Sequence, residues 1–550
     1  MTCSKLFSGD LPELLDKVIR YFHYDYKTLH SCILVNRFWV RIAIPLLWED
    51  PFSKKFPKNY RFIEIYLHYL NDNDKAKLND YEIDYHLFSS NTLFNYSRFI
   101  QRLDTSKVRK SIERWTKAVG SSTLITSIRN RNLPSNFTKL MFKSLFLIFI
   151  ENEVNLHCFE VKIFNNPDMI YFDLIIELIL QNPNFINNIK SLTFYFDIII
   201  NNNIIKFIRF LDSTNYCNPI SSLYLKFHNS TIKKISLQII KSQKNIKKIS
   251  FDCNGRFLDN LVLLSLKNTN CSNTLNSIIF YFVDFEKIDV LSEVFNYLNV
   301  LESIHIIYCD SIDYKFTQQI NNIIKPFKLK SLFLDLMDEN DELLEPLIEK
   351  SGDYLENLGF IYSRSRSQRL LQLIIKYCSK IKCLVPTWPN SQSIHLVFNL
   401  IELINQNLNY LFIDPFVISY NDHYYDASSI ILRNLGQILP VRLEYLDLIL
   451  RINTNDLEIF LRNLQNNFIK KLLINGIKEK EGQDIFPYIK EFIVEKKRVK
   501  YLAIKETFHY EENDWFFQKD KVEEIELYDI QVLKYKDLFI DINDFIKETY

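Results

Sequence analysis

A short pattern of apolar positions recurs through the C-terminal two thirds of the chain. Each copy has an apolar residue, two variable positions, a second apolar residue, one variable position and a third apolar residue, as at Ile189, Leu192 and Phe194. The closely spaced second and third positions are typical of a strand with one buried face. The complete copies begin at Ile189, Ile220, Ile246, Leu275, Leu301, Leu329, Leu355, Leu408, Leu443, Ile469, Val499 and Val522, with a partial copy at Ile381 and an earlier one at Leu156.

The copies follow one another about every 28 residues, and segments with helical periodicity fill the intervals. A strand and a helix that alternate in this way bury a continuous core only when neighbouring repeats stack. We therefore predict a curved solenoid of about fourteen units over residues 155–550. A purely helical repeat is a weaker interpretation, because the period-2 apolar pair indicates a strand. The clearest helical intervals are 287–298, 342–350, 368–378, 393–404, 457–464 and 485–494.

The first fifty residues have a different pattern, which predicts three short helices. Residues 10–22 carry apolar side chains at helical spacing, with Asp10 placed to cap the helix and Pro12 in its first turn. Two further helical stretches, at about 27–35 and 36–48, follow after short breaks. Three such helices form a small core, so we expect them to lean on a partner or on the rest of the chain.

Residues 53–154 fit neither pattern and predict a helical connector that covers the first repeat. A solenoid exposes its core at each end unless another element caps it. A charged, polar break is expected at 71–80. The helices are expected at 60–70, 94–103, 108–119 and 137–149.

The N-terminal segment resembles an F-box. The resemblance rests on LPELLDKVIRYF at 11–22 and LHSCILVNRFWVRIAIPLLW at 29–48, and covers about residues 9–52. The later repeats resemble the leucine-rich-repeat horseshoe that many F-box proteins carry. The expected fold is therefore α/β, with an F-box-like three-helix module at 1–52, the connector at 53–154 and an irregular leucine-rich-repeat solenoid at 155–550.

The resemblance implies that the chain is the substrate-recognition subunit of an SCF ubiquitin ligase. Its F-box would bind a Skp-type adaptor and, through it, a cullin, while other subunits transfer ubiquitin to a target held by the repeats. The alternative is a non-catalytic repeat scaffold with no ligase association. The residues that the resemblance places on the adaptor are Leu11, Pro12, Leu14, Leu15, Val18, Ile19, Val35, Asn36, Phe38 and Trp39.

The chain departs from both families at identifiable positions. Asn36 and Arg37 stand where many F-box sequences have Cys and Lys. In the repeats, an Asn or Cys three residues after the last apolar position would satisfy backbone groups of the turn, and only Asn254 and Cys309 clearly occupy that slot. We therefore expect degenerate repeats with irregular curvature.

Target binding is expected on the concave face of the solenoid, where the variable strand positions point away from the core. Exposed Tyr and Phe side chains there supply binding area at low entropic cost. The candidate target-binding residues are Tyr195, Tyr224, Lys226, Tyr281, His305, Phe333, Asp335, Phe412, Asp414 and Tyr528.

The charge balance and the lengths of the apolar runs favour protein partners over nucleic acids or membranes. The 67 Lys and Arg against 66 Asp and Glu give a net charge of +1, which lacks the basic excess of a nucleic-acid binder. Apolar runs fall short of the roughly 18 residues of a membrane helix, so no membrane partner is expected. The nine cysteines form no CxxC pair, which favours reduced thiols in the cytoplasm or nucleus.

No catalytic, metal or cofactor site is predicted. The eight glycines are scattered and form neither of the common phosphate-binding loops. The histidines make no HExxH or HxxxH pair, and Cys378 and Cys383 have no neighbouring histidine ligands. A hydrolase or transferase within the repeats would need convergent polar groups, for which the sequence shows no motif.

Overall fold

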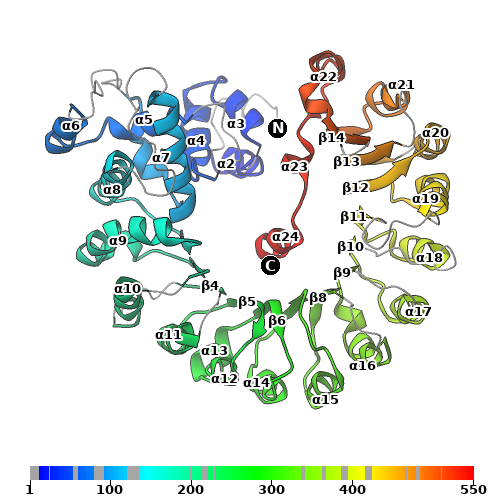
Figure 1. The fold of residues 1–550 in the computed structure, drawn as a ribbon, viewed down its shortest axis with the longest axis horizontal. Coiled ribbons are helices and arrows are strands. Elements are labelled where there is room, and N and C mark those ends of the chain that lie inside the picture. Colours follow the sequence, from blue (N-terminus) through cyan, green and yellow to red (C-terminus); the bar gives the residue numbers. More distant parts are fainter. Residues whose placement is uncertain are drawn as a thin grey trace. The chain divides into compact units, whose positions relative to one another are not determined.

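The chain folds into two compact units, as seen in a computed structural model of residues 1–550 (Figure 1). Unit 1 comprises Met1–Ser250 and Asn268–Thr274, and unit 2 comprises Phe251–Lys267 and Leu275–Tyr550. The structure describes residues 12–23, 25–53, 60–79, 92–120, 136–198, 201–213, 220–226, 230–335, 341–361, 367–385, 394–414, 424–464, 467–478, 484–508 and 511–550.

Unit 1 begins with three short helices, as the N-terminal pattern predicts. They are α2 (Pro12–Arg20), α3 (Tyr26–Cys32) and α4 (Arg37–Trp48). The later helices of the unit are α5 (Phe62–Leu67), α6 (Asp72–Asn79), η2 (Tyr96–Phe99), α7 (Thr105–Gly120), α8 (Asn136–Glu151), α9 (Asn166–Gln181), η3 (Pro183–Ile186), α10 (Asn202–Ser213), α11 (Ser230–Ser242) and α13 (Thr269–Thr274).

The strands of unit 1 form a parallel sheet in chain order. They are β1 (Arg102–Asp104), β2 (Cys158–Ile163), β3 (Ser191–Phe196) and β4 (Ser222–Lys226). The predicted repeat positions lie in register, because Phe159 pairs with Leu192 and Leu192 pairs with Leu223. The interpretation of these copies as stacked strands is confirmed.

The segment expected to be a helical connector contains the first strand of the sheet. The predicted helix at 94–103 is wrong: η2 ends at Phe99, and β1 then pairs with β2, with Leu103 opposite Phe159. A strand of three residues is too short to show a period-2 pattern, which explains the error. The predicted polar break at 71–80 is also wrong over most of its length, since α6 occupies it.

The strands of unit 2 continue the same alternation. β5 (Lys248–Phe257) starts at the end of unit 1, and β6 to β14 form a parallel series in chain order. Its members are β6 (Ser277–Asp284), β7 (Ser303–Ile307), β8 (Leu329–Asp335), β9 (Asn357–Ile361), β10 (Cys383–Val385), β11 (Tyr410–Ile413), β12 (Arg442–Ile452), β13 (Phe468–Lys478) and β14 (Val499–Phe508).

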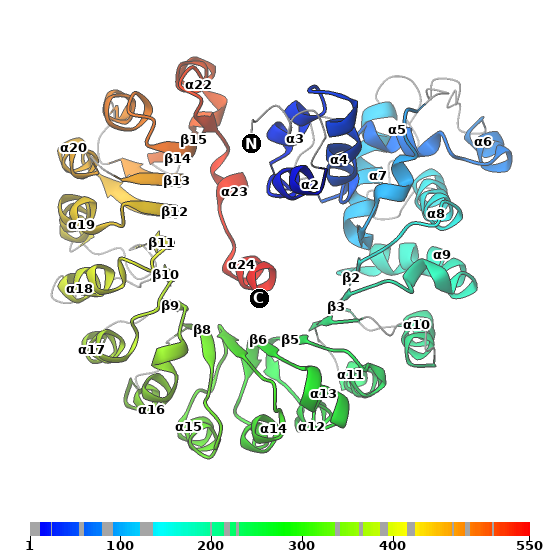
Figure 2. The ribbon, with the colours of Figure 1, turned by 180° about the vertical axis from the view of Figure 1, so that it is seen from behind.

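Helices connect consecutive strands of unit 2, so the fold is mixed α/β and solenoid-like. The helices α14 to α21 lie on one side of the strands, here called the outer side, and α23 and α24 lie on the inner side (Figures 1 and 2). The bounds are α12 (Asn260–Leu264), α14 (Leu291–Tyr297), α15 (Tyr314–Asn321), α16 (Asp341–Ser351), η5 (Gly352–Tyr354), α17 (Ser367–Tyr377), α18 (Ile394–Ile404), α19 (Tyr424–Ile438), α20 (Thr454–Asn463), α21 (Phe486–Ile489), the π-helix η6 (Lys490–Val494), η7 (Trp515–Phe517), α22 (Lys519–Glu526), α23 (Tyr535–Leu538) and α24 (Ile542–Thr549).

The central apolar residues of successive repeats pair directly. Leu384, from the partial copy, pairs with Leu358 on one side and Leu411 on the other. A register shift occurs between β7 and β8, where a break after Ile304 places Leu332 opposite Ile306.

The last predicted copy, from Val522 to Leu527, is wrong, because this segment forms the helix α22 instead of a strand. After β14 the chain reverses into β15 (Glu511–Asp514), which is antiparallel to β14, and β16 (Gln531–Val532) later pairs with β14 in parallel. Val522 and Ile525 are three residues apart, a spacing that also suits one face of a helix.

Candidate functional site

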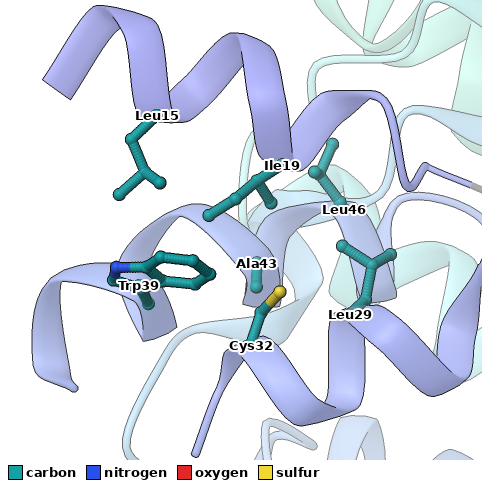
Figure 3. Packing of buried hydrophobic residues seen from close by; sticks show 7 residues of the cluster. All are labelled: Leu15, Ile19, Leu29, Cys32, Trp39, Ala43 and Leu46. Atoms are coloured by element: carbon teal, nitrogen blue, oxygen red, sulfur yellow. The ribbon is translucent and has the colours of Figure 1, made fainter. Parts of the chain in front are cut away.

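The three N-terminal helices close around a core of their own (Figure 3). Leu15 and Ile19 of α2 point toward the side chains of α3 and α4 (Figure 3). The buried cluster consists of Leu15, Ile19, Leu29, Cys32, Trp39, Ala43 and Leu46. The core is therefore formed entirely by the first fifty residues.

Two polar side chains set where the module's helices begin. The Asp25 carboxylate accepts a hydrogen bond from the backbone N–H of Thr28 at the start of α3. The amide oxygen of Asn36 accepts from the N–H groups of Phe38 and Trp39 at 2.9 and 3.0 Å. Such caps satisfy backbone donors that a helix leaves unpaired. The cap at Asn36 also fixes the sharp turn between α3 and α4.

A second apolar stripe on α2 faces outward. Leu14, Val18 and Tyr21 keep 49%, 38% and 82% of their surface exposed, and they recur at helical spacing. Leu34 and Val35, on the turn before α4, keep 78% and 51%. These five residues are named the module patch. Single exposed apolar residues are normal, whereas five within one small module make it the candidate interaction surface.

The ten residues implied for adaptor binding divide between core and surface. Leu15, Ile19 and Trp39 are buried in the module, so they support the surface from below. Leu14, Val18, Val35 and Asn36 are exposed, and Phe38 is half-buried. Leu11 lies outside the described residues, as does the side chain of Pro12, although Pro12 itself begins α2.

Tyr21 and Leu34 are members of the patch that the sequence analysis missed. Tyr21 lies seven residues after Leu14, so its place on the outward stripe is visible in the helical spacing. Leu34 could not have been assigned from periodicity, because it lies in a turn whose direction depends on the Asn36 cap.

The end of α4 joins the module to the rest of unit 1. The Trp48 ring lies 5.6 Å from Tyr66 and 4.4 Å from Tyr96, centroid to centroid. The carbonyl of Glu49 accepts hydrogen bonds from the backbone N–H groups of Gln101 and Arg102, next to β1. The module is thus anchored through this end, whereas Leu15 and Trp39 belong to the module's own core.

The inner strand positions predicted to bind a target are mostly not exposed. The expected exposure is wrong for Tyr281, His305, Phe333 and Phe412, whose side chains are buried, and their role in target binding stays a prediction. Asp414 is half-buried, the side chain of Asp335 lies outside the described residues, and Tyr528 is on the turn after α22 instead of on a strand.

In unit 1, the predicted residues contact one another. The Lys226 ammonium, which is buried, lies 4.4 Å from the centroid of the Tyr195 ring. That ring packs against Phe164 at 4.5 Å, and Tyr224 is half-buried. A cation over an aromatic ring is stabilising, so these groups are already engaged within the fold.

Residues 531–550, named the strap, cover the inner side of the strands in unit 2 (Figure 1). The Tyr535 hydroxyl donates to the Asp447 carboxylate at 2.5 Å, and the Tyr445 hydroxyl accepts from the N–H of Ile540 at 3.3 Å. Further along, the Tyr281 hydroxyl donates to the carbonyl of Asn543 at 3.2 Å. Among the predicted target-binding residues, the strap therefore contacts Tyr281 and His305.

Asp447 is a buried acid at the first strap anchor. Only 2% of its surface is exposed, and both hydroxyl neighbours, Tyr535 and Tyr445, are themselves uncharged at neutral pH. Burial raises the pKa of Asp447 to about 7, while the tyrosine hydrogen bonds lower it and the nearby Asp414 raises it further. Desolvation therefore outweighs hydrogen bonding at this carboxyl.

The second anchor is a polar network around the Tyr550 hydroxyl. It donates to Glu356 at 2.9 Å and accepts from the Asn357 amide at 3.0 Å, while the Tyr550 ring lies 4.4 Å from His305. Burial raises the pKa of Glu356, but hydrogen bonds from Lys330, Lys382 and Tyr550 outweigh it and hold the value at about 2. Glu356 is therefore ionised at neutral pH, whereas Asp447 has a pKa close to neutral pH and titrates there.

The placement of the remaining candidate metal ligands and of the cysteine thiols bears on whether they form a further site. Within the described residues, no group of three or more His, Cys, Asp or Glu side chains is arranged to hold a metal ion. The cysteines of the described ranges form no disulfide, and burial raises the pKa of the Cys309 and Cys378 thiols. Among the helices that the structure describes, none is long and apolar enough to cross a membrane.

Comparison with known proteins gives no match from which a function could be transferred. The chain matches no protein-family model. A search of curated proteins likewise finds no match. The module patch and the strap-covered inner face are thus what the chain itself offers for interpretation.

Proposed function

We propose that the chain is a substrate-recognition subunit of an SCF-type ubiquitin ligase, whose N-terminal module docks a Skp-type adaptor. The observation that carries this proposal is the module patch, which stays exposed while the helices beneath it form a closed core. The F-box-like sequence of the same helices supports the identity of the partner. In this proposal the leucine-rich-repeat-like units bind the target, in the cytoplasm or nucleus, and other subunits transfer ubiquitin.

The module patch is exposed but lies on a packed core, which holds it in place. The patch residues lie on elements whose other faces are fixed by Leu15, Ile19 and Trp39, so the patch is presented without further ordering. A preorganised apolar surface loses little conformational entropy on binding. A central apolar cluster is also the part of an interface that contributes most affinity.

The alternative, a scaffold without ligase association, is favoured by one contact. The end of α4 is fastened to the connector by Trp48 and by the Glu49 carbonyl, as expected of helices that merely cap a repeat array. This contact leaves the module patch exposed, so a measurement of adaptor binding distinguishes the ligase subunit from the scaffold.

Co-purification with a Skp-type adaptor tests the proposal. The full chain is expected to retain the adaptor, and Leu14→Asp, Val18→Asp and Val35→Asp are each expected to reduce the retained adaptor at least tenfold. These positions are exposed, so an aspartate there alters the surface and not the core. Leu15→Asp would be uninformative, because Leu15 is part of the module core.

Val441→Asp is the matched control. Val441 is an exposed valine of unit 2, so the substitution introduces the same charge change outside the module. It should bind the adaptor as the parent does. Adaptor binding that survives all three patch substitutions, or that is absent from the parent, would refute the proposal and leave the scaffold alternative.

A further inference from the structure

The inner side of unit 2 buries several polar side chains. His305, Ser331, Asn357 and Asp447 are all buried there. His305 and Ser331 share a hydrogen bond of 2.8 Å, and the Asn357 amide donates to the Ser331 hydroxyl at 2.8 Å. Burying polar groups costs free energy unless each is hydrogen-bonded. A permanent cover would be more stable on apolar side chains, whereas a polar face can return to water when its cover leaves.

The strap meets this face mainly through side chains. Backbone pairing is confined to its start, where β16 lies beside β14 and the Leu533 N–H donates to the Leu502 carbonyl. Beyond that point the contacts are the hydroxyls of Tyr535 and Tyr550 and the Phe545 ring, 4.8 Å from Tyr410. The strap backbone adds one hydrogen bond to the hydroxyl of Tyr445 and one to that of Tyr281. Side-chain hydrogen bonds of this kind contribute about 1–3 kcal/mol each, with the larger value applying to the charged Glu356, and each is weak enough for exchange.

The strap also carries its own local structure. The Asp541 carboxylate accepts hydrogen bonds from the N–H groups of Asn543 and Asp544 and so caps α24. Ile542 and Ile546 are buried, four residues apart on one face of this helix. The occupant of the inner face is therefore a short amphipathic helix, α24, preceded by the strand β16 and the single-turn helix α23.

We propose that the inner face of β6 to β14 is a peptide-docking surface and that the strap is its displaceable internal ligand. The external partner is a protein segment of the same chemistry, with an amphipathic helix and tyrosine hydroxyls that donate to Asp447 and Glu356. This inference rests on the proposed function only in treating that segment as part of the target. The docking itself requires no adaptor.

Tethering explains why the strap occupies the site at rest. A ligand attached by a short linker acts at an effective concentration of about millimolar. A peptide added in solution must compete with it and binds weakly. Loosening the tethered copy should therefore raise the apparent affinity of the same sequence added from outside.

A labelled peptide of residues 529–550 tests the proposal by fluorescence polarisation. The peptide is titrated into the full parent chain and into the Tyr535→Phe/Tyr550→Phe variant, which lacks both hydroxyl anchors. The variant is expected to bind the peptide at least tenfold more tightly than the parent. Tyr314→Phe, at an exposed tyrosine of α15, should behave as the parent, and a peptide with both tyrosines replaced by phenylalanine should bind the variant more weakly.

A second experiment tests the proposal even if the strap of the double tyrosine variant stays bound to the inner face. A protease site inserted after the exposed Asp529 allows the strap to be cut from the intact chain. We expect the cut segment to be lost on gel filtration and the vacated chain to bind the labelled peptide. A strap that stays bound after cutting, or a vacated face that does not bind the peptide, would overturn the proposal. Neither outcome depends on adaptor binding, so failure here is distinct from failure of the proposed function.

Discussion

Asp447 shows how a single side chain can couple the fold to pH. Its carboxyl is buried between the hydroxyls of Tyr535 and Tyr445, with no cation among these hydrogen-bond partners. Glu356, at the other anchor, is held ionised by two lysines. The two acids of the inner face therefore respond to pH in opposite directions, because only one of them has cationic neighbours.

We predict that strap closure weakens as pH rises from 5.5 to 7.5. The pKa of Asp447 in the closed fold is about 7, above the ordinary value of 3.8, so closure favours the protonated acid. Its contribution is complete below the ordinary pKa and is lost as pH rises through 7, which amounts to roughly 2 kcal/mol over this window. Hydrogen exchange of residues 531–550, corrected for the intrinsic rate, should report the loss of protection.

Asp447→Asn is the control for this pH dependence. An amide of nearly the same shape does not titrate, so its strap protection should be flat over the same window. Glu356 does not interfere, because its stabilising charge is lost only as pH falls toward about 2. An equal slope in the parent and in the asparagine variant would contradict the assignment to Asp447.

Gly359 accounts for the burial of Phe333. A Cβ atom at Gly359 would lie 2.4 Å from the Phe333 ring, so the absence of a side chain makes room for that ring. We predict that Gly359→Ala lowers the free energy of unfolding by about 1–3 kcal/mol, the usual cost of overpacking. Chemical denaturation measures this, and Phe333→Leu in the same chain should recover part of the loss. Additive effects of the two substitutions would argue against a direct clash.

At the scale of elements, one helix can serve two surfaces. The apolar residues of α2 appear in sequence as a single broad stripe, but Leu15 and Ile19 face the module core while Leu14 and Val18 face solvent. Periodicity identifies the helix, whereas the packing of α3 and α4 decides which half of the stripe is covered. The same limit explains residues 522–527, whose apolar spacing suits a helix face as well as a strand.

Neighbouring repeats are also joined at their helix ends. The Lys350 ammonium of α16 donates to the carbonyls of Ile320, Asn321 and Ile323 at 2.7, 3.3 and 2.8 Å, at the end of α15. Carbonyls at the C-terminal end of a helix can accept further hydrogen bonds, and a cation there interacts favourably with the helix dipole.

We predict that Lys350→Met destabilises the chain by about 1–2 kcal/mol, because methionine keeps the packing of the stem but removes the charged donor. Thermal unfolding should show a lower midpoint than the parent. Lys315→Met, at an exposed position on α15 itself, is the matched control and should leave the midpoint unchanged. Equal effects of the two substitutions would exclude the inter-repeat cap as the cause.

At the scale of the whole molecule, the two proposed surfaces belong to different compact units. The module patch lies in unit 1, and the strap with its anchors lies in unit 2. The residues of the two surfaces share no hydrogen-bond network in the described ranges. Substitutions in one surface are therefore expected to act independently of the other.

This independence gives a prediction for the intact chain. Leu14→Asp should abolish adaptor retention while leaving hydrogen exchange of residues 531–550 unchanged. Tyr535→Phe/Tyr550→Phe should increase exchange of the strap while leaving adaptor retention unchanged. A triple variant that combines these substitutions should show the sum of both effects, and any change of strap protection caused by Leu14→Asp would reveal coupling between the units.

The sequence alone determined the repeating units. A period-2 apolar pair and an intervening helix require burial on one face only, which is a local property of each repeat. The predicted strands from Leu156 to Val499 are confirmed for this reason, including the partial copy at β10. Cys309 also occupies its expected role, since its sulfur lies 3.4 Å from the Val283 N–H and 3.5 Å from the Phe280 carbonyl.

Only the tertiary structure decided what the inner face contacts. The exposure of Tyr281 or His305 depends on a segment more than 200 residues away in sequence, because Tyr281 is hydrogen-bonded to Asn543 and the His305 ring packs against Tyr550. No local pattern encodes such a contact, because the strap has ordinary helical and polar spacing of its own. The local apolar pattern determines which face of each repeat is buried. Which distant segment covers the inner face is decided only when the repeats stack and the strap packs across them.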